Sequence, residues 1–120
     1  MNHKEYKSLL AELNESNKDE KEILLAKLRN EMDSLDENLA KILNKRTYIS
    51  VIIGRVKRAL KMPTYSPERE REISKKINKF AKKPLTISAL QRIYERILDE
   101  SRAIQKNDIE ENEIKYGKDK

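Results

Sequence analysis

The sequence predicts an all-α protein, and three observations support this. Charged residues make up 40% of the 120-residue chain, whereas glycine occurs only twice and proline three times. Leu, Ile, Lys, Glu, Arg and Ala, which favour helices, dominate the sequence. No segment alternates apolar and polar residues as a half-buried strand would. We expect several helices, one of them very long, and oligomerisation, because the core of a single chain would be thin.

Residues 1–20 are expected to form an N-terminal extension. A short amphipathic helix is predicted over residues 1–13, because four apolar side chains fall on one helical face and the polar segment at 14–17 then ends it. The four are Tyr6, Leu9, Leu10 and Leu13.

A long helix is predicted to begin near Lys18 and to end near Lys61. Asn17 and Glu20 have the spacing of a capping box, and the Met-Pro-Thr segment at 62–64 stops the helix. About 44 residues would span ~65 Å, more than a compact domain of this size needs. Its apolar seam comprises Leu25, Leu28, Met32, Leu35, Leu39, Ile42, Ile49, Ile53, Val56 and Leu60. With only 37% hydrophobic content, such a chain encloses a thin core, so we expect this seam to pack against a second copy.

Two further helices follow. Ser66 as N-cap and Pro67 at the first helical position begin one that runs to about Ala81. Pro84 interrupts the chain, and Thr86 or Ser88 caps the last helix. Its heptad seam comprises Ile87, Leu90, Tyr94, Ile97, Ser101 and Ile104. We therefore divide the chain into the extension at 1–20, a helical domain at 21–110 and a polar C-terminal tail at 111–120.

Arg46 occupies a seam position where the heptad pattern requires an apolar residue. A buried cation is costly unless it meets an anion, so Arg46 indicates either a paired carboxylate, such as Asp36, Glu37 or Glu100, or a bound anionic ligand. Lys57 follows eleven residues later, on the same side of the helix to within about 20°. The two side chains can therefore converge on one small ligand.

Other polar residues on or beside the seams complete a candidate site. Ser101 and Gln105 contribute a hydroxyl and a neutral amide from the last helix, and Arg69 with Glu70 open the helix before it. The set fits a small dianion and lacks a paired nucleophile and base, which indicates binding and electrostatics rather than proton transfer. Each residue also has a structural interpretation: Ser101 and Gln105 can set helix register, and Glu70 can stabilise a helix N-terminus.

Arg29 has the same heptad phase as Lys57 but lies ~42 Å from it along a straight helix. The two cannot share a site within one chain, and each alone could be an ordinary charge flanking a coiled coil. If two long helices pack antiparallel across a two-fold axis, however, Arg29 of one subunit reaches the Lys57 end of the other. The homodimer would then carry two equivalent composite sites.

Several classes of protein are disfavoured by composition. The chain has no cysteine and only one histidine, His3, so we expect no metal site and no metal cofactor. No apolar run approaches the ~20 residues of a membrane span, and the N-terminus lacks the apolar core of a signal peptide, so we expect no membrane association and a cytoplasmic location. The net charge is +6, but basic and acidic residues are interleaved, so we expect no nucleic-acid partner.

Four segments of the chain together form a recognisable pattern: LRNEMDSLDENLAKILNKR at 28–46, IIGRVK at 52–57, YSPERERE at 65–72 and DESRAIQ at 99–105. In their order and spacing, over roughly residues 24–108, they resemble the all-helical chorismate mutases of the AroQ class. The resemblance implies an intertwined three-helix homodimer that converts chorismate to prephenate, in phenylalanine and tyrosine biosynthesis, without a cofactor.

The resemblance also implies a role for each candidate residue. Arg46, together with Arg29 of the partner chain, matches the positions that bind the two substrate carboxylates. Lys57 and Gln105 match the pair that donates hydrogen bonds to the ether oxygen, and Glu70 matches the acceptor for the ring hydroxyl.

The remaining positions line the same site in the family. Ser101 matches a carboxylate contact, and Arg69 matches a further cation. Ser66 stands where many relatives have Asp, and it keeps the capping role and the backbone amide.

Two other functions fit the same residues. Isochorismate-pyruvate lyase resembles this scaffold performing an elimination on an isomeric substrate. A non-catalytic helical regulatory or interaction module would retain the fold without the reaction. Assays on both substrates separate these three functions.

Overall fold

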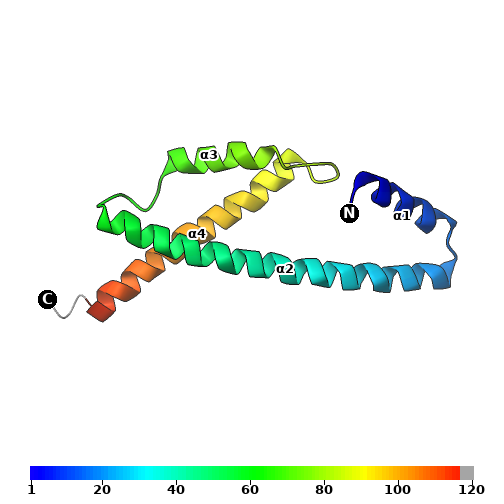
Figure 1. Ribbon diagram of the computed structural model, residues 1–120, viewed down its shortest axis with the longest axis horizontal. Helices are drawn as coiled ribbons and strands as arrows, with labels where there is room; N and C mark the ends of the chain where they lie inside the picture. The colour runs from blue at the N-terminus through cyan, green and yellow to red at the C-terminus, as the bar shows by residue number, and fades with distance from the viewer. Residues whose placement is uncertain (117–120) are drawn as a thin grey trace. The chain divides into compact units, whose positions relative to one another are not determined.

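The computed structural model describes residues 1–116, and the side chains of residues 1–111. Its regular elements within that range are all helices: α1 (His3–Glu15), α2 (Lys18–Ala59), α3 (Pro67–Asn78) and α4 (Ile87–Tyr116) (Figure 1). The all-α class is therefore confirmed. The chain forms two compact units, whose boundary falls within α2 between Leu43 and Asn44.

The short helix predicted over residues 1–13 is present as α1, so the expected number of three helices per chain, which left this helix out, is wrong. Asn2 caps α1 by accepting a hydrogen bond from the Glu5 backbone N–H at 2.8 Å, and the Glu5 carboxylate accepts one from the Asn2 backbone N–H at 3.4 Å. This reciprocal capping box satisfies two N–H groups that the first turn leaves without partners. The described part of the chain thus has four helices.

The start of α2 is the one that the sequence predicts. Asn17 accepts a hydrogen bond from the Glu20 backbone N–H at 2.9 Å, and its own N–H donates to the Glu20 carboxylate at 3.5 Å. Leu24, one turn further along, is one of the two apolar side chains that are buried among the described residues. Local capping chemistry therefore sets where this helix begins.

The end of α2 has a Schellman motif. The Met62 N–H donates to the Lys57 carbonyl at 2.8 Å, and the Lys61 N–H donates to the Arg58 carbonyl at 3.0 Å. Lys61 adopts the left-handed conformation, with φ of 58°, that glycine most often supplies at this position. The helix therefore stops directly after the turn that carries Lys57.

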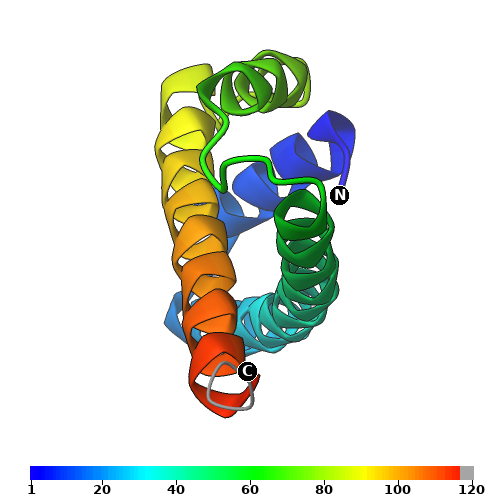
Figure 2. The same cartoon turned by 90° about the vertical axis from the view of Figure 1, so that its left-hand side faces the viewer.

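In the second unit, α3 and α4 pack side by side and α4 crosses the C-terminal part of α2, as Figures 1 and 2 show from two directions. Ser66 caps α3 through the Arg69 N–H at 3.4 Å, and α3 ends at Asn78, before the predicted end at Ala81. Thr86, rather than Ser88, caps α4 through the Ala89 N–H at 3.1 Å.

α4 continues into the predicted polar tail as far as Tyr116. The remaining four tail residues, 117–120, lie outside the described residues.

The crossing of α2 and α4 is fixed by a two-point ion pair. Arg55 donates to the two oxygens of Asp108 at 3.0 and 2.8 Å. Hydrogen bonding by Arg55 lowers the pKa of Asp108, partial burial opposes that shift, and the charges of Arg55 and Arg58 lower the pKa further. The folded state therefore favours the ionised carboxylate.

Asp108→Asn should lower the free energy of unfolding at pH 7 by up to about 1 kcal/mol, the upper range for ion pairs that water reaches. Because the folded pKa of Asp108 is depressed, this contribution is complete above the unfolded pKa of about 3.9 and is lost as pH falls through the folded value. Urea unfolding at pH 7 and at steps below pH 4 tests this. Glu37→Gln, which removes an exposed ion pair with Lys41, is the matched control. If the loss of stability in Asp108→Asn were the same in acid as at pH 7, the ionised Asp108 carboxylate would not be its cause.

Most large apolar side chains of α2 are exposed. Leu24 and Leu98 are the only described apolar residues classed as buried. The exposed members of the predicted seam are Leu25, Met32, Leu35, Leu39, Ile42, Ile49, Ile53, Val56 and Leu60. Such a row of exposed apolar side chains is typical of an interaction surface. No helix of the described chain is long and apolar enough to cross a membrane.

Candidate active site

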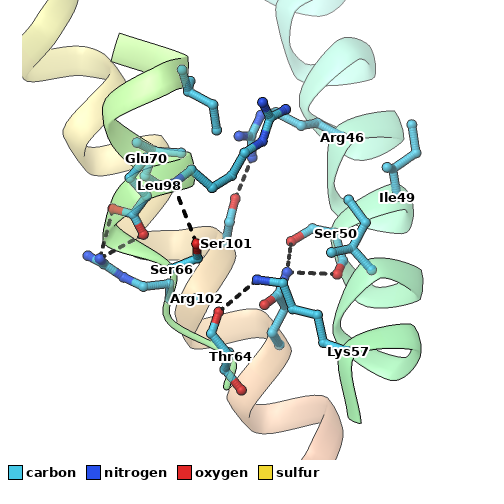
Figure 3. Close-up of a pocket in the computed structure, with 14 residues that line it drawn as sticks. Arg46, Ile49, Ser50, Lys57, Thr64, Ser66, Glu70, Leu98, Ser101 and Arg102 are labelled. Carbon is cyan, nitrogen blue, oxygen red and sulfur yellow. Dashed lines mark hydrogen bonds and ion pairs between the residues drawn. The ribbon is translucent and has the colours of Figure 1, made fainter. Parts of the chain in front are cut away.

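One pocket of about 420 Å³ lies in the second unit, between the C-terminal part of α2, the loop after it, the start of α3 and the middle of α4 (Figure 3). Its volume is within the range typical of small-molecule sites. The apolar part of its wall comprises Ile49, Ile53, Ile73 and Leu98. Charged and hydroxyl side chains make up most of the rest.

Seven of the eight predicted site residues line this pocket. They are Arg46, Lys57, Ser66, Arg69, Glu70, Ser101 and Gln105. The eighth, Arg29, lies on α2 within the first unit and is not among the lining residues. Its action from a partner chain remains a prediction.

Arg46 is held by a hydroxyl group. Its guanidinium donates a hydrogen bond to Ser101 Oγ, which in turn donates to the Ile97 carbonyl at 3.0 Å. Two of the carboxylates considered as ion-pair partners are engaged elsewhere: Glu37 with Lys41 at 3.0 Å and Glu100 with Arg96 at 2.8 Å. Arg46 therefore faces the pocket with a neutral partner, and its charge remains available to an anion.

Lys57 is positioned by the loop after α2. Its ammonium donates to the Thr64 carbonyl at 3.1 Å (Figure 3). A lysine ammonium has three hydrogens, so this contact fixes the group and leaves two donors for a ligand. The Schellman motif that ends α2 turns the chain back so that Thr64 reaches Lys57.

Gln105 is buried against α2. Its amide nitrogen donates to the Ser50 carbonyl at 2.9 Å and to Ser50 Oγ at 3.0 Å, and both residues are less than a tenth exposed. Gly54 makes this approach feasible, because a Cβ there would lie 3.0 Å from Gln105 Cγ. Two acceptors on Ser50 thus hold the two N–H bonds of Gln105.

Gln105→Glu should destabilise the protein and inactivate it at neutral pH. Burial against the Ser50 carbonyl favours the protonated acid, so the pKa of the introduced carboxyl rises above its usual value of about 4.3. The stability deficit is therefore smallest below that value and grows as pH rises through the folded pKa. We expect partial recovery of activity in acid, measured by turnover and thermal unfolding between about pH 5 and pH 8.

Gln105→Met is the control, since it removes the same hydrogen bonds without adding a titratable group. Equal activity of Gln105→Glu across that pH range would show that Gln105 does not contact the reacting oxygen.

Glu70 is the only carboxylate among the residues lining the pocket, and Arg102 binds it. Arg102 Nη1 lies 2.9 Å from each of the two Glu70 oxygens. Arg69, next to Glu70, is more than half exposed and pairs with Glu72 at 3.3 Å. The α3 wall of the pocket thus presents one carboxylate that is already fixed.

Sequence reasoning missed Ser50 and Arg102 as lining residues. Ser50 is the only polar residue between Ile49 and Gly54, and that isolation was a usable signal. Arg102 is next to a seam position, and its partner Glu70 is 32 residues away. Only the packing of α4 on α3 brings those two together.

Four cations and one carboxylate line the pocket: Arg46, Lys57, Arg69 and Arg102 against Glu70. The excess of positive charge, with hydroxyl and amide groups beside it, suits a small ligand that carries two negative charges and a hydroxyl group. Within the described residues, no three His, Cys, Asp or Glu side chains gather closely enough to hold a metal ion.

Comparisons with known proteins agree with one another. Residues 28–106 match the sequence model of the family described as chorismate mutase type II. The chorismate mutase of Methanocaldococcus jannaschii is 27% identical over 95 residues, which are 78% of this chain and 96% of that protein. The bifunctional chorismate mutase/prephenate dehydratase of Aquifex aeolicus is 35% identical over 86 residues, 68% of this chain, and this chain spans only 24% of that protein.

A solved structure is similar as well. The chorismate mutase from Helicobacter pylori, in complex with prephenate, superposes with a TM-score of 0.68 at 36% identity. The match covers 73% of this chain and 96% of that chain.

Proposed function

Because the chain belongs to the type II chorismate mutase family, we propose that it is an isomerase that rearranges chorismate to prephenate. The observation that best supports this is the convergence of Arg46, Lys57, Glu70 and Gln105 on one pocket from three helices. The reaction is intramolecular: a carbon–oxygen bond breaks while a carbon–carbon bond forms. It requires no nucleophile and no general acid, which agrees with the residues available.

The protein acts as a homodimer in this proposal. The exposed apolar seam of α2 and the half-exposed Ile49 and Ile53 at the pocket support a second chain that covers both. Burying that seam supplies the hydrophobic free energy that the thin core of one chain lacks. In an antiparallel pairing, Arg29 of the partner adds a cation to the pocket and closes it from water.

The first contribution to catalysis is selection of the reactive conformer. Chorismate must adopt a compact diaxial shape before its two reacting carbons meet. Arg46, Arg69 and the partner's Arg29 fix the two carboxylates, while Glu70 accepts a hydrogen bond from the ring hydroxyl. Ser101 orients Arg46 and adds a carboxylate contact, and Ser66 holds the start of α3. Fixing the substrate in this way removes part of the entropic barrier.

The second contribution is electrostatic. Negative charge grows on the ether oxygen as its bond to carbon lengthens, and Lys57, which lines the pocket and uses one of its three hydrogens for the Thr64 carbonyl, donates to that oxygen. Gln105 donates to the same oxygen with the N–H that otherwise bonds Ser50 Oγ, and the Ser50 hydroxyl rotates away to allow this. The bond from Gln105 to the Ser50 carbonyl is kept and holds the amide in place. Each such donor contributes about 3–4 kcal/mol to lowering the barrier.

The relatives favour the mutase over the two alternatives. The Helicobacter pylori structure contains prephenate, which is the product of the rearrangement and not of pyruvate elimination. An interaction module without activity would not need four cations around one carboxylate.

The direct test is to incubate purified protein with chorismate and with isochorismate, in the presence and absence of a chelator. We expect prephenate from chorismate, no pyruvate from isochorismate, and no effect of the chelator. Pyruvate release would assign the lyase function, and inertness toward both substrates would favour the interaction module.

A further inference from the structure

Among the four cations of the pocket, Arg102 is the one whose carboxylate partner, Glu70, also lines the pocket; Arg69 pairs instead with Glu72 outside it. Its guanidinium contacts the two Glu70 oxygens at 2.9 Å, donates to Asp99 through Nη2, and lies 4.9 Å from the centre of the Tyr65 ring. Arg46 and Lys57 instead have neutral partners, a hydroxyl and a carbonyl. Three groups from two helices and a loop therefore fix Arg102.

The charge around Arg102 excludes it as a binding group for the anionic substrate. Two carboxylates, Glu70 and Asp99, face one guanidinium, so the cluster is net negative, whereas Arg46 and Lys57 keep their positive charge. The side chain of Arg102 is 33% exposed and that of Glu70 is 23% exposed, so water screens their attraction only in part. We therefore look for an effect of Arg102 on the substrate that is exerted through the Glu70 carboxylate.

Glu70 depends on Arg102 for its orientation. A carboxylate has about four lone-pair directions, and Arg102 occupies one on each oxygen, which leaves the others for a ligand. Without the arginine, a glutamate in the first turn of α3 has several rotamers, some of which point to solvent. The cation–π contact with Tyr65 and the bond to Asp99 keep the guanidinium itself in place. Figure 3 shows the contact between Arg102 and Glu70.

We propose that Arg102 is a positioning residue that holds the Glu70 carboxylate toward the ring hydroxyl of the substrate. This inference rests on the proposed function, since it requires a ligand with two carboxylates and a hydroxyl. It predicts that Arg102 affects recognition of the hydroxyl and leaves recognition of the carboxylates unchanged.

Two bicyclic ether diacids that mimic the transition state test this, one with the ring hydroxyl and one without it. Calorimetric titration of each into wild-type and Arg102→Met protein gives four dissociation constants. We expect Arg102→Met to weaken the hydroxylated mimic about tenfold, the lower range for a hydrogen bond to a charged group. The mimic without the hydroxyl should bind both proteins within about twofold, because its carboxylates meet other cations.

Further variants separate positioning from a structural role. In a Glu70→Gln background, Arg102→Met should produce no additional loss, because the two residues act as one unit. Arg102→Lys should retain part of the selectivity for the hydroxyl and covers the case in which Arg102→Met does not fold. Arg96→Met removes an exposed arginine of the same helix, paired with Glu100 outside the pocket, and should change neither constant.

Equal weakening of the two mimics, or an undiminished effect of Arg102→Met in the Glu70→Gln background, would overturn the inference. Either result would mean that Arg102 binds the carboxylates or stabilises the fold. If wild-type protein binds neither mimic and does not consume chorismate, the proposed function fails and the inference fails with it. Turnover by the wild-type protein together with unchanged selectivity in Arg102→Met and Arg102→Lys would overturn the inference alone.

Discussion

Replacing Arg46 with alanine is expected to lower kcat/KM for chorismate by about 100- to 1,000-fold, the usual effect of removing one preorganised charged donor. Arg46 lines the pocket, and its only described partner is the hydroxyl of Ser101, so its charge has no other use within the described residues. In the variant, Ser101 Oγ loses the hydrogen bond from Arg46 and keeps the one that it donates to the Ile97 carbonyl. Steady-state kinetics on purified protein measure the loss.

Arg46→Lys separates charge from geometry. A lysine keeps the positive charge but cannot form the two parallel hydrogen bonds that a guanidinium makes with a carboxylate, so we expect an intermediate loss. Arg96→Ala, on the exposed face of α4, is the control and should retain full activity. An Arg46→Ala enzyme within a few-fold of wild type would show that Arg46 has only a structural role.

The helix starts could be predicted because their signals are local. Asn17 with Glu20, Ser66 with Pro67, and Thr86 each form the cap that their residue types favour. The end of α2 was predicted near Lys61 from the Met-Pro-Thr segment and lies at Ala59, because Lys61 adopts a left-handed conformation that the sequence does not signal, since glycine usually supplies it. The N-terminal helix was predicted from its apolar face, and the Asn2 and Glu5 capping box is a further local signal for its start.

The site was predictable as far as one helix face or one family motif extends. Arg46 and Lys57 were identified from the heptad phase of a single helix, and Glu70 and Gln105 from their positions at a helix start and beside a seam; the family motifs added their roles. Ser50 and Arg102 were not identified, because their roles depend on how α4 crosses α2 and packs on α3. Contacts between residues 32 to 55 positions apart are not encoded in any local pattern.

Loss of activity is also expected on replacing Arg29, the one predicted site residue that does not line the pocket. Arg29→Ala and Lys57→Ala homodimers should each lack one essential cation in both sites and be nearly inactive. Separately, we expect each to lose about 100-fold or more of wild-type kcat/KM. Each variant should nevertheless fold, since neither side chain belongs to the apolar seam.

Refolding an equal mixture of these two inactive variants tests the composite site most directly. About half of the dimers should be mixed, and if Arg29 acts in the partner's site, one of the two sites in each mixed dimer is wild type. Roughly a quarter of full activity should then return, by the statistics of a two-fold symmetric dimer. If activity stays at background although native mass spectrometry detects the mixed dimers, Arg29 does not act across the interface, and the intertwined dimer with shared sites is wrong.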